Sequence, residues 1–317
     1  TYKWTLSLSV PLRWTGYTGV GFSRISVNPS LSIIYKLNYA WRFTAHASYK
    51  ERYGEMTDLY DRPYQTDYRN SVWNCGILPV YRQQLYSVYG EYKNTAREFF
   101  ATVNLTHNRE WYNRIYEQRI ENGQVQRVSL PLSNHGSGYT VKSTLSKGFY
   151  DLGLKTSFLA LLNISKAEQS SGGQRLPYQY RLMRLEPKVI WTPNRHWETS
   201  YQTDIRYGGN KIGERTRLAP LWNVTQQVQL SYIFSPIEAS LSVDHYHNDV
   251  NEDQSVNAVF ADFSVLWKSR RWQITATATN LFDKRTYAYT RYASLESYTS
   301  WVRIRPREFL VAIRYRL

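Results

Sequence analysis

Apolar and polar residues alternate along most of the chain with a period of two. Between positions 2 and 14, the even positions are Tyr2, Trp4, Leu6, Leu8, Val10, Leu12 and Trp14. The odd positions between them are Lys3, Thr5, Ser7, Ser9, Pro11 and Arg13. Because successive side chains of a strand point to opposite faces of a sheet, this segment predicts a strand with one apolar and one polar face. Residues 25–39 and 41–49 repeat the pattern.

The breaks between these strands are of two kinds that take turns along the chain. Short breaks occur at residues 38–41, 93–96, 148–151, 192–195, 235–236 and 268–271. Long polar breaks occupy residues 15–21, 51–79, 110–138, 166–176, 208–215, 247–254 and 290–298. Asn122 and Gly123 predict a hairpin tip inside the third of them. The alternation predicts fourteen strands joined as up-and-down hairpins, and no segment keeps a helical spacing over ten residues.

Strand length and turn chemistry favour a membrane-spanning sheet. The strands run to about 9–15 residues, whereas strands of ordinary globular proteins have about 5–6. Aromatic residues bracket the short breaks, as Tyr39 and Trp41 do the first. Long strands, short turns at one end, long loops at the other and aromatic girdles are typical of a transmembrane antiparallel up-and-down β-barrel. The high strand propensity of Tyr and Trp is the alternative explanation for their number, but it does not explain their position at turns.

Composition removes several other classes of protein. The chain has 28 Tyr, 11 Trp and 11 Phe, which excludes a disordered protein. Cys75 is the single cysteine, so no disulfide framework exists within the chain. The longest apolar runs have about five residues, and a spanning helix needs about twenty. A soluble sandwich, propeller or lectin-like barrel would need shorter strands and more turn glycine. The mean hydropathy of −0.56 would normally indicate a soluble protein, but it averages an apolar and a polar face that contact different solvents.

The net charge of +15 indicates an anionic partner. No basic run or nucleic-acid motif occurs, so nucleic acid is not expected as a partner. By alternation, several cations lie on the polar face: Lys3, Arg13, Lys36, Arg42, His46, Lys155, Arg206 and Arg314. A cationic lumen would favour anionic solutes. The alternative is that any water-exposed wall carries such charges.

No catalytic constellation or cofactor motif is present, so neither an enzyme nor a cofactor is expected. His245 and His247 lie on one side of a strand and are weak metal candidates, because no third ligand is evident. Aromatic residues in two long breaks could stack on sugars or peptides, or could belong to a girdle: Tyr53, Tyr60, Tyr64, Tyr68, Trp111, Tyr112 and Tyr116.

The C-terminal stretch carries a family resemblance. A strand that runs into NLFDKR, whose first residues are Asn280, Leu281, Phe282 and Asp283, is followed by a loop and by RPREFLVAIRYRL. This order resembles the C-terminal end of TonB-dependent outer-membrane receptors, in particular those of the Bacteroidota. The terminal alternation of Phe309, Val311, Ile313, Tyr315 and Leu317 is similar to the signal for barrel assembly, which usually ends in an aromatic residue rather than leucine.

The resemblance implies ligand-gated, energy-coupled nutrient uptake through a 22-stranded barrel that is filled by a plug domain. With fourteen strands and no plug, residues 1–317 are expected to form the C-terminal part of such a barrel. A self-contained 14-stranded porin-like channel and a β-rich surface adhesin remain alternatives. The implied partners are outer-membrane lipid and lipopolysaccharide, a TonB-type energy transducer acting through the plug, a surface lipoprotein, and an unknown small solute, glycan or peptide. The implied location is the bacterial outer membrane, with a periplasmic C-terminus.

Overall fold

The computed structural model describes residues 3–18, 21–121, 124–213, 216–217, 219–251, 253–293 and 296–316. Nearly all of its elements are antiparallel β-strands, which confirms the predicted all-β class. Two single-turn 3-10 helices, η1 (Met56–Leu59) and η2 (Tyr150–Leu152), interrupt them. No helix in the described part of the chain is long and apolar enough to cross a membrane.

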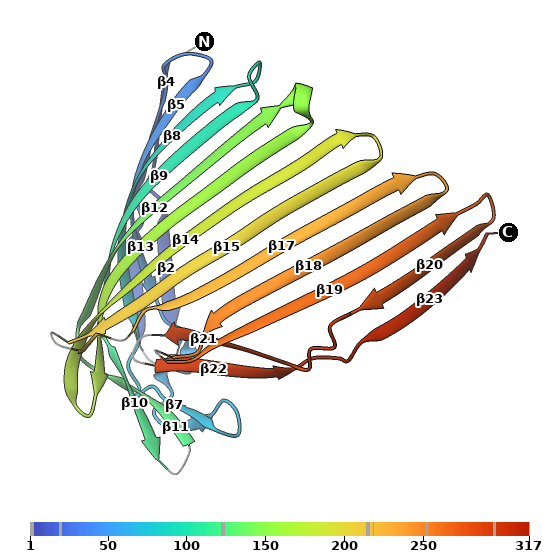
Figure 1. Cartoon of the computed structure of the whole chain (residues 1–317). Coiled ribbons are helices and arrows are strands. Elements are labelled where there is room, and N and C mark those ends of the chain that lie inside the picture. The colour runs from blue at the N-terminus through green and yellow to red at the C-terminus, as the bar shows by residue number, and fades with distance from the viewer. Residues whose placement is uncertain are drawn as a thin grey trace.

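Fourteen strands form one continuous wall in chain order, as the alternation predicted (Figure 1). Each is hydrogen-bonded to the next: β1 (Trp4–Ser9), β4 (Ser30–Lys36), β5 (Trp41–Tyr53), β8 (Val80–Asn94), β9 (Phe99–Tyr112), β12 (Asn134–Phe149), β13 (Leu154–Ser171), β14 (Gln174–Asn194), β15 (Trp197–Ile212), β17 (Leu221–Phe234), β18 (Ile237–Asp249), β19 (Ser255–Lys268), β20 (Trp272–Thr279) and β23 (Glu308–Tyr315).

The two ends of the wall differ. At one end, called here the short-turn end, consecutive strands are joined by turns of a few residues, and β1 starts and β23 ends there. At the other, the loop end, five short strands extend the same sheet: β6 (Tyr64–Gln65), β7 (Asn70–Trp73), β10 (Ile115–Glu121), β11 (Gln124–Leu130) and β16 (Thr216–Arg217). The hairpin β10–β11 projects beyond the wall with β7 beside it (Figure 1). Its predicted tip, Asn122 and Gly123, lies outside the described residues.

Three of the long polar breaks consist mostly of strands rather than loops, and one of them, residues 110–138, holds the hairpin β10–β11. Strands β13 and β14 continue through residues 166–176 to a tight turn at Gly172 and Gly173, whose φ angles are +58° and +76°. Residues 290–298 belong to the hairpin of β21 (Thr286–Ala293) and β22 (Glu296–Arg303), apart from residues 294 and 295, which are not described. Where both faces of a strand meet water, apolar alternation disappears although the hydrogen-bond ladder continues.

Proline divides the first two predicted strands. The alternating segments at residues 2–14 and 25–39 are split into β1 and β2 (Leu12–Tyr17), and into β3 (Phe22–Val27) and β4. Pro11 and Pro29 lie at the breaks and have no N–H to donate to the ladder. Their carbonyl groups remain paired, with the N–H of Asn28 at 3.0 Å from Pro11 and that of Tyr49 at 2.9 Å from Pro29.

The strand register separates two faces, because directly opposed residues share a face of the sheet. One lateral row of the apolar face reads Leu6, Ile33, Ala45, Val88, Leu105, Val141, Leu162 and Met183. The adjacent row of the polar face reads Ser7, Ser32, His46, Ser87, Thr106, Thr140 and Asn163. The apolar face carries no protein layer in the described structure, and Val88 and Leu105 are 53% and 48% exposed.

Aromatic belts border the apolar face at both ends. Near the short-turn end, ring pairs link neighbouring strands at centroid distances of 4.7 Å for Trp41–Tyr92, 4.6 Å for Trp197–Tyr232 and 4.7 Å for Trp272–Tyr315. Toward the loop end, the pairs are His107–Tyr139 at 4.3 Å and Tyr207–Trp222 at 4.8 Å. The apolar surface between the belts, called here the membrane band, is therefore bounded as a hydrocarbon layer would require.

Both edges of the wall are free in the described residues. Strand β1 pairs with β4 alone and β23 with β20 alone, so the curved sheet of Figure 1 does not close on itself. Each edge presents a row of N–H and C=O groups, which are costly to leave unpaired in hydrocarbon.

Candidate functional site

A cavity of 980 Å³ lies at the loop end of the wall. Strand β7 and the hairpin β10–β11 form one side of it, and the loop-side ends of β9, β12, β13 and β14 form the other. Because these segments come from distant parts of the chain, the cavity exists only once the wall has assembled.

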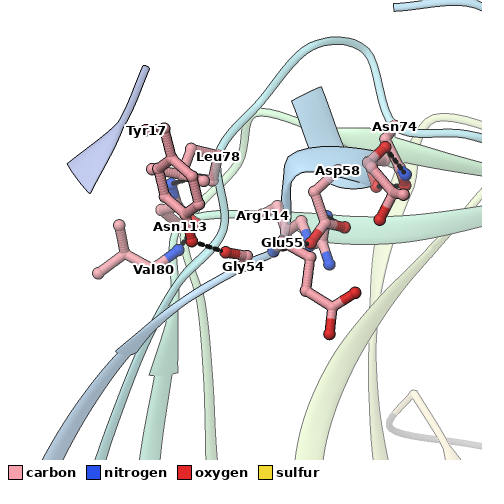
Figure 2. Close-up of polar contacts among 11 residues, drawn as sticks. Tyr17, Gly54, Glu55, Asp58, Asn74, Leu78, Val80, Asn113 and Arg114 are labelled. Carbon is pink, nitrogen blue, oxygen red and sulfur yellow. Dashed lines mark hydrogen bonds and ion pairs between the residues drawn. The ribbon is translucent and has the colours of Figure 1, made fainter. Parts of the chain in front are cut away.

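An ion pair and an asparagine fasten the loop that follows β5 to the strand ends (Figure 2). The Arg114 guanidinium lies 2.9 Å from the Asp58 carboxylate, with side chains only 12% and 19% exposed. The Asn113 side chain donates to the Leu78 carbonyl at 2.9 Å and accepts from the Val80 N–H at 2.8 Å. A partly buried pair of this kind costs more to break than a surface pair, since either charge left alone is poorly solvated.

Two further contacts tie this loop to its neighbours. The Tyr17 hydroxyl donates to the Gly54 carbonyl, joining β2 to the loop (Figure 2). The Asn74 amide donates to the Thr57 carbonyl at 3.3 Å and accepts from the Ser129 hydroxyl at 3.5 Å. The loop is therefore held in place on several sides, and the cavity beside it has defined walls.

Glu110 is the polar centre of the inner wall of the cavity. Its carboxylate accepts hydrogen bonds from Tyr81 at 3.1 Å, Gln83 at 3.1 Å, Asn108 at 3.0 Å and Tyr112 at 3.0 Å. Burial and the Glu110 charge raise the pKa of the Tyr81 phenol to about 12, and they raise the pKa of Tyr112 as well. No cation pairs with Glu110 in the described structure, so its negative charge is balanced by neutral donors only.

Tyr116 supplies a stacking surface in the same cavity. The Arg127 guanidinium carbon lies 3.6 Å from the centre of its ring, and that of Arg114 lies 4.8 Å from it. Tyr112 and Tyr178 also line the cavity. Aromatic rings, arginine and an unpaired carboxylate together suit a planar or polar solute.

Glu117 connects the hairpin β10–β11 to the tip of β13–β14. It is 5% exposed and accepts hydrogen bonds from Arg119 at 2.8 Å, the Ser170 hydroxyl at 2.8 Å and the Gly173 N–H at 3.1 Å. The hydrogen bonds from Arg119 and Ser170 hold the pKa of Glu117 below its ordinary value. A charged carboxylate is thus part of the loop-end architecture.

The cations expected on the polar face divide into two groups. Arg42 pairs with Glu91 at 2.6 Å, and Arg206 pairs with Asp204 at 2.6 Å. Arg184, which the sequence analysis missed, contacts the same Asp204 at 3.0 Å from the neighbouring strand. For the remaining cations, the described residues provide no ion pair; these are Lys3, Arg13, Lys36, His46, Lys155 and Arg314.

The motif of the family resemblance forms a clasp between strands. Asn280 adopts a φ of +51°, is 6% exposed, and donates from its side chain to the carbonyls of Lys284 at 2.8 Å and Arg305 at 2.9 Å. The N–H of Leu281 donates to the Ala261 carbonyl at 2.8 Å, and Asp283 accepts the N–H of Arg307 at 3.0 Å.

Phe282 of the same motif is 56% exposed, so its ring lies largely outside the clasp. Beside the clasp lies a second cavity of 550 Å³, lined among others by Asp244, Tyr246, Phe260 and Asp262. The hydrogen bonds of Asn280, Leu281 and Asp283 give this motif a structural role, which is to hold neighbouring strands and loops together.

Other expected residues lie apart from both cavities. The terminal alternation places Phe309, Val311, Ile313 and Tyr315 on the apolar face of the edge strand β23, while Leu317 lies outside the described residues. His247 lies 2.8 Å from the Asn257 side chain and 3.4 Å from Asp249, and His245 lies on the same face of β18. No group of three metal-ligating side chains occurs in the part of the chain that the structure describes.

Comparison with known proteins places the fold. No family model matches the chain, and no curated protein sequence matches it. The FrpB iron transporter from Neisseria meningitidis is similar in structure, with a TM-score of 0.54 and 9% identity over 92% of this chain and 47% of that one. BauA, the ferric preacinetobactin receptor from Acinetobacter baumannii, gives a TM-score of 0.51 and 8% identity over 98% of this chain and 55% of that one. The chain spans about half the length of these structures. Its fold is therefore that of the outer-membrane β-barrels, with a wall similar to those of an iron transporter and a ferric receptor.

Proposed function

We propose that this chain forms the C-terminal part of the barrel of a TonB-dependent outer-membrane receptor, for ligand-gated and energy-coupled nutrient uptake. The observation that carries this proposal is the open wall of fourteen strands, which matches about half of two longer barrels. A self-contained 14-stranded channel would need β1 and β23 to pair with each other. The free edges therefore favour a barrel completed by further strands.

In this proposal the loop end faces the cell exterior, and the short-turn end, with the C-terminus, faces the periplasm. The solute binds first in the 980 Å³ cavity, where Glu110, Tyr116 and Arg127 offer it polar and aromatic contacts. A plug formed by residues outside 1–317 is remodelled by a TonB-type transducer. The polar face of the wall, with its cations Lys36, Lys155 and Arg314, then provides the conduit.

A ferric chelate is the first solute class to test, because both similar structures are named for iron or a ferric ligand. The other solute classes are glycans and peptides, which a surface lipoprotein would help to bind. Neither catalysis nor a cofactor is part of the proposed function.

The test is uptake by cells that express the complete protein in their outer membrane. We expect accumulation of a labelled solute that stops when the energy transducer is deleted, together with little conductance in a planar bilayer. Uptake that is insensitive to the transducer, with steady conductance, would identify a passive porin-like channel instead. A protein whose gel migration does not shift on heating would not be a membrane barrel, and the adhesin alternative would then hold.

A further inference from the structure

A row of polar side chains crosses the apolar face of the wall just beyond the loop-side belt. Arg109 is directly opposed to Ser137, Ser137 to Lys166, Lys166 to Gln179, and Gln179 to Lys211. These five residues therefore share a face and one register row across five consecutive strands, from β9 to β15. Each lies two residues along its strand from the row that contains His107 and Tyr139. The row therefore lies on the loop side of the aromatic belt, next to the border of the membrane band.

Arg181 lies one row closer to the membrane, opposed to Ile164 and Gly209. Arg109, Lys166, Arg181 and Lys211 together are called here the basic row. Since neighbouring strands lie about 4.8 Å apart, successive cations of the upper row are about 10 Å from each other. A headgroup with more than one phosphate can span such a distance.

The basic row has no acidic partner. Within the described ranges, no ion pair involves Lys166, Arg181 or Lys211, and the guanidinium of Arg109 contacts only His107, at 3.3 Å. The side chains of Arg109, Lys166 and Arg181 are exposed.

The acids that follow the row on the same face of the sheet already have cationic partners, and Glu110 lies on the opposite face. Glu168, two residues beyond Lys166, lies 3.5 Å from Arg175. Glu51 lies 3.1 Å from Arg82. The row therefore presents net positive charge toward the lipid side of the sheet.

Two hollows adjoin the row. A groove of 310 Å³ is lined by Ser137, Lys166, Glu168, Gln179 and Lys211, among others, and the Glu168 carboxylate is paired with Arg175. A groove of 540 Å³ lies on the membrane band below it and is lined largely by apolar side chains, including Ala45, Ala47, Leu105, Tyr139 and Val141. Strand β12 connects the two, because Ser137 and Tyr139 are successive outward residues of that strand. A polar hollow above an apolar groove matches the shape of an amphiphile.

We propose that the basic row binds the phosphorylated headgroup of an anionic lipid of the surrounding leaflet, and that an acyl chain of this lipid occupies the apolar groove. Charge-assisted hydrogen bonds from Arg and Lys to phosphate are strong and directional, and long cationic side chains at this level keep their charges outside the hydrocarbon. Lys166 and Ser137 also line the 980 Å³ cavity, but this proposal is tested by lipid retention and not by solute uptake, so either can fail without the other.

The test compares two variants with equal loss of charge. In K166Q/R181Q/K211Q, the cations are removed from the apolar face. In the control K50Q/K142Q/K188Q, three cations are removed from the polar face of the same wall. The complete protein is placed in phosphatidylcholine nanodiscs that contain diphosphorylated lipid A, and retained lipid A is counted by native mass spectrometry. A heat-induced gel shift verifies that each variant is folded.

We expect wild type and control to retain lipid A and the basic-row variant to lose it by about tenfold or more, with partial rescue when position 166 carries arginine. Equal retention by both variants would overturn the proposal. So would equal binding of dephosphorylated lipid A, because the phosphates would then be irrelevant. Binding of inorganic phosphate in neutral detergent, with no preference for the lipid, would show a soluble-anion site and would also refute it.

Discussion

The membrane band and the loop end are built from the same continuous strands, yet they bury apolar groups in different ways. In the band, Val88 and Leu105 remain 53% and 48% exposed, because lipid replaces the missing protein layer. At the loop end, Ile115 and Val128 are 0% and 1% exposed within a small core beside β7. The same hydrogen-bonded strands therefore cross both lipid and water, and only the part in water needs a buried apolar core.

The largest expected effect concerns that small core. Ile115→Ala removes a fully buried side chain, so we expect a loss of about 2–5 kcal/mol in the local stability of β10–β11. Amide hydrogen exchange of the hairpin measures this change. Ile120→Ala, on the same strand and 69% exposed, is the matched control and should have little effect. If the gel shift of the whole wall changed with Ile115→Ala, the two regions would not be independent.

The next test places a charged side chain on the apolar face of the membrane band. Val88→Arg places a charge near the middle of the membrane band and should destabilise folding into lipid vesicles by about 2–4 kcal/mol. Ser87→Arg, one residue away on the polar face, should cost far less, because that face meets water. Denaturant titration of both variants in vesicles measures the difference. Equal costs would mean that the faces are assigned wrongly.

A smaller loss of stability is expected at the loop end where a carboxylate, rather than apolar packing, joins two hairpins. Glu117→Gln keeps the shape of the side chain but loses its charge-assisted bonds to Arg119 and Ser170, so we expect a loss of about 1.5–3 kcal/mol in hairpin stability. Limited proteolysis of β10–β11 detects the loosening. Glu198→Gln, a neutralisation in the exposed part of β15 far from the hairpin, is the control and should leave the digest unchanged.

The same carboxylate predicts an acid response. The pKa of Glu117 is lowered in the folded protein, so its contribution to stability is complete above the ordinary value of 4.5 and is lost as the pH falls through the folded value. Proteolysis of the hairpin should therefore accelerate below pH 4.5 in wild type more than in Glu117→Gln. An identical acid response of the two proteins would contradict this role.

The smallest effect is an alkaline one. The pKa of Tyr81 is raised to about 12 and that of Tyr112 is also raised, by burial and by the Glu110 charge. The folded loop end keeps these protons above pH 10, where the unfolded chain loses them, so its stability declines between about pH 10 and 12. Titration of tyrosinate absorbance should show a late phase that Tyr81→Phe diminishes and Glu110→Gln shifts to lower pH. Tyr150→Phe, 88% exposed at the other end, should not alter that phase.

Beyond the border of the membrane band, the alternation of apolar and polar residues no longer predicts the strands. Residues 166–176 look like a loop because their two faces are equally polar, yet they continue β13 and β14 to a turn at Gly172 and Gly173. The side-chain contacts of the candidate site were even harder to predict from the sequence. Arg184 on β14 contacts Asp204 on the neighbouring strand β15, and Glu110 accepts hydrogen bonds from residues of β8 and β9. Both contacts depend on the register of the two strands, which the length of the connecting turn sets. A period of two assigns each residue to a face of the sheet but does not identify its neighbour on the next strand.

The all-β class, the fourteen strands and the face of each side chain in the band follow from the alternation along the chain, because alternation is a local response to two different solvents. Three features appear only in the folded chain: the free edges at β1 and β23, the clasp formed by Asn280, and the single row of Arg109, Lys166 and Lys211. These features depend on which residues face each other across strands, and that relation is set by hydrogen-bond register rather than by composition or period.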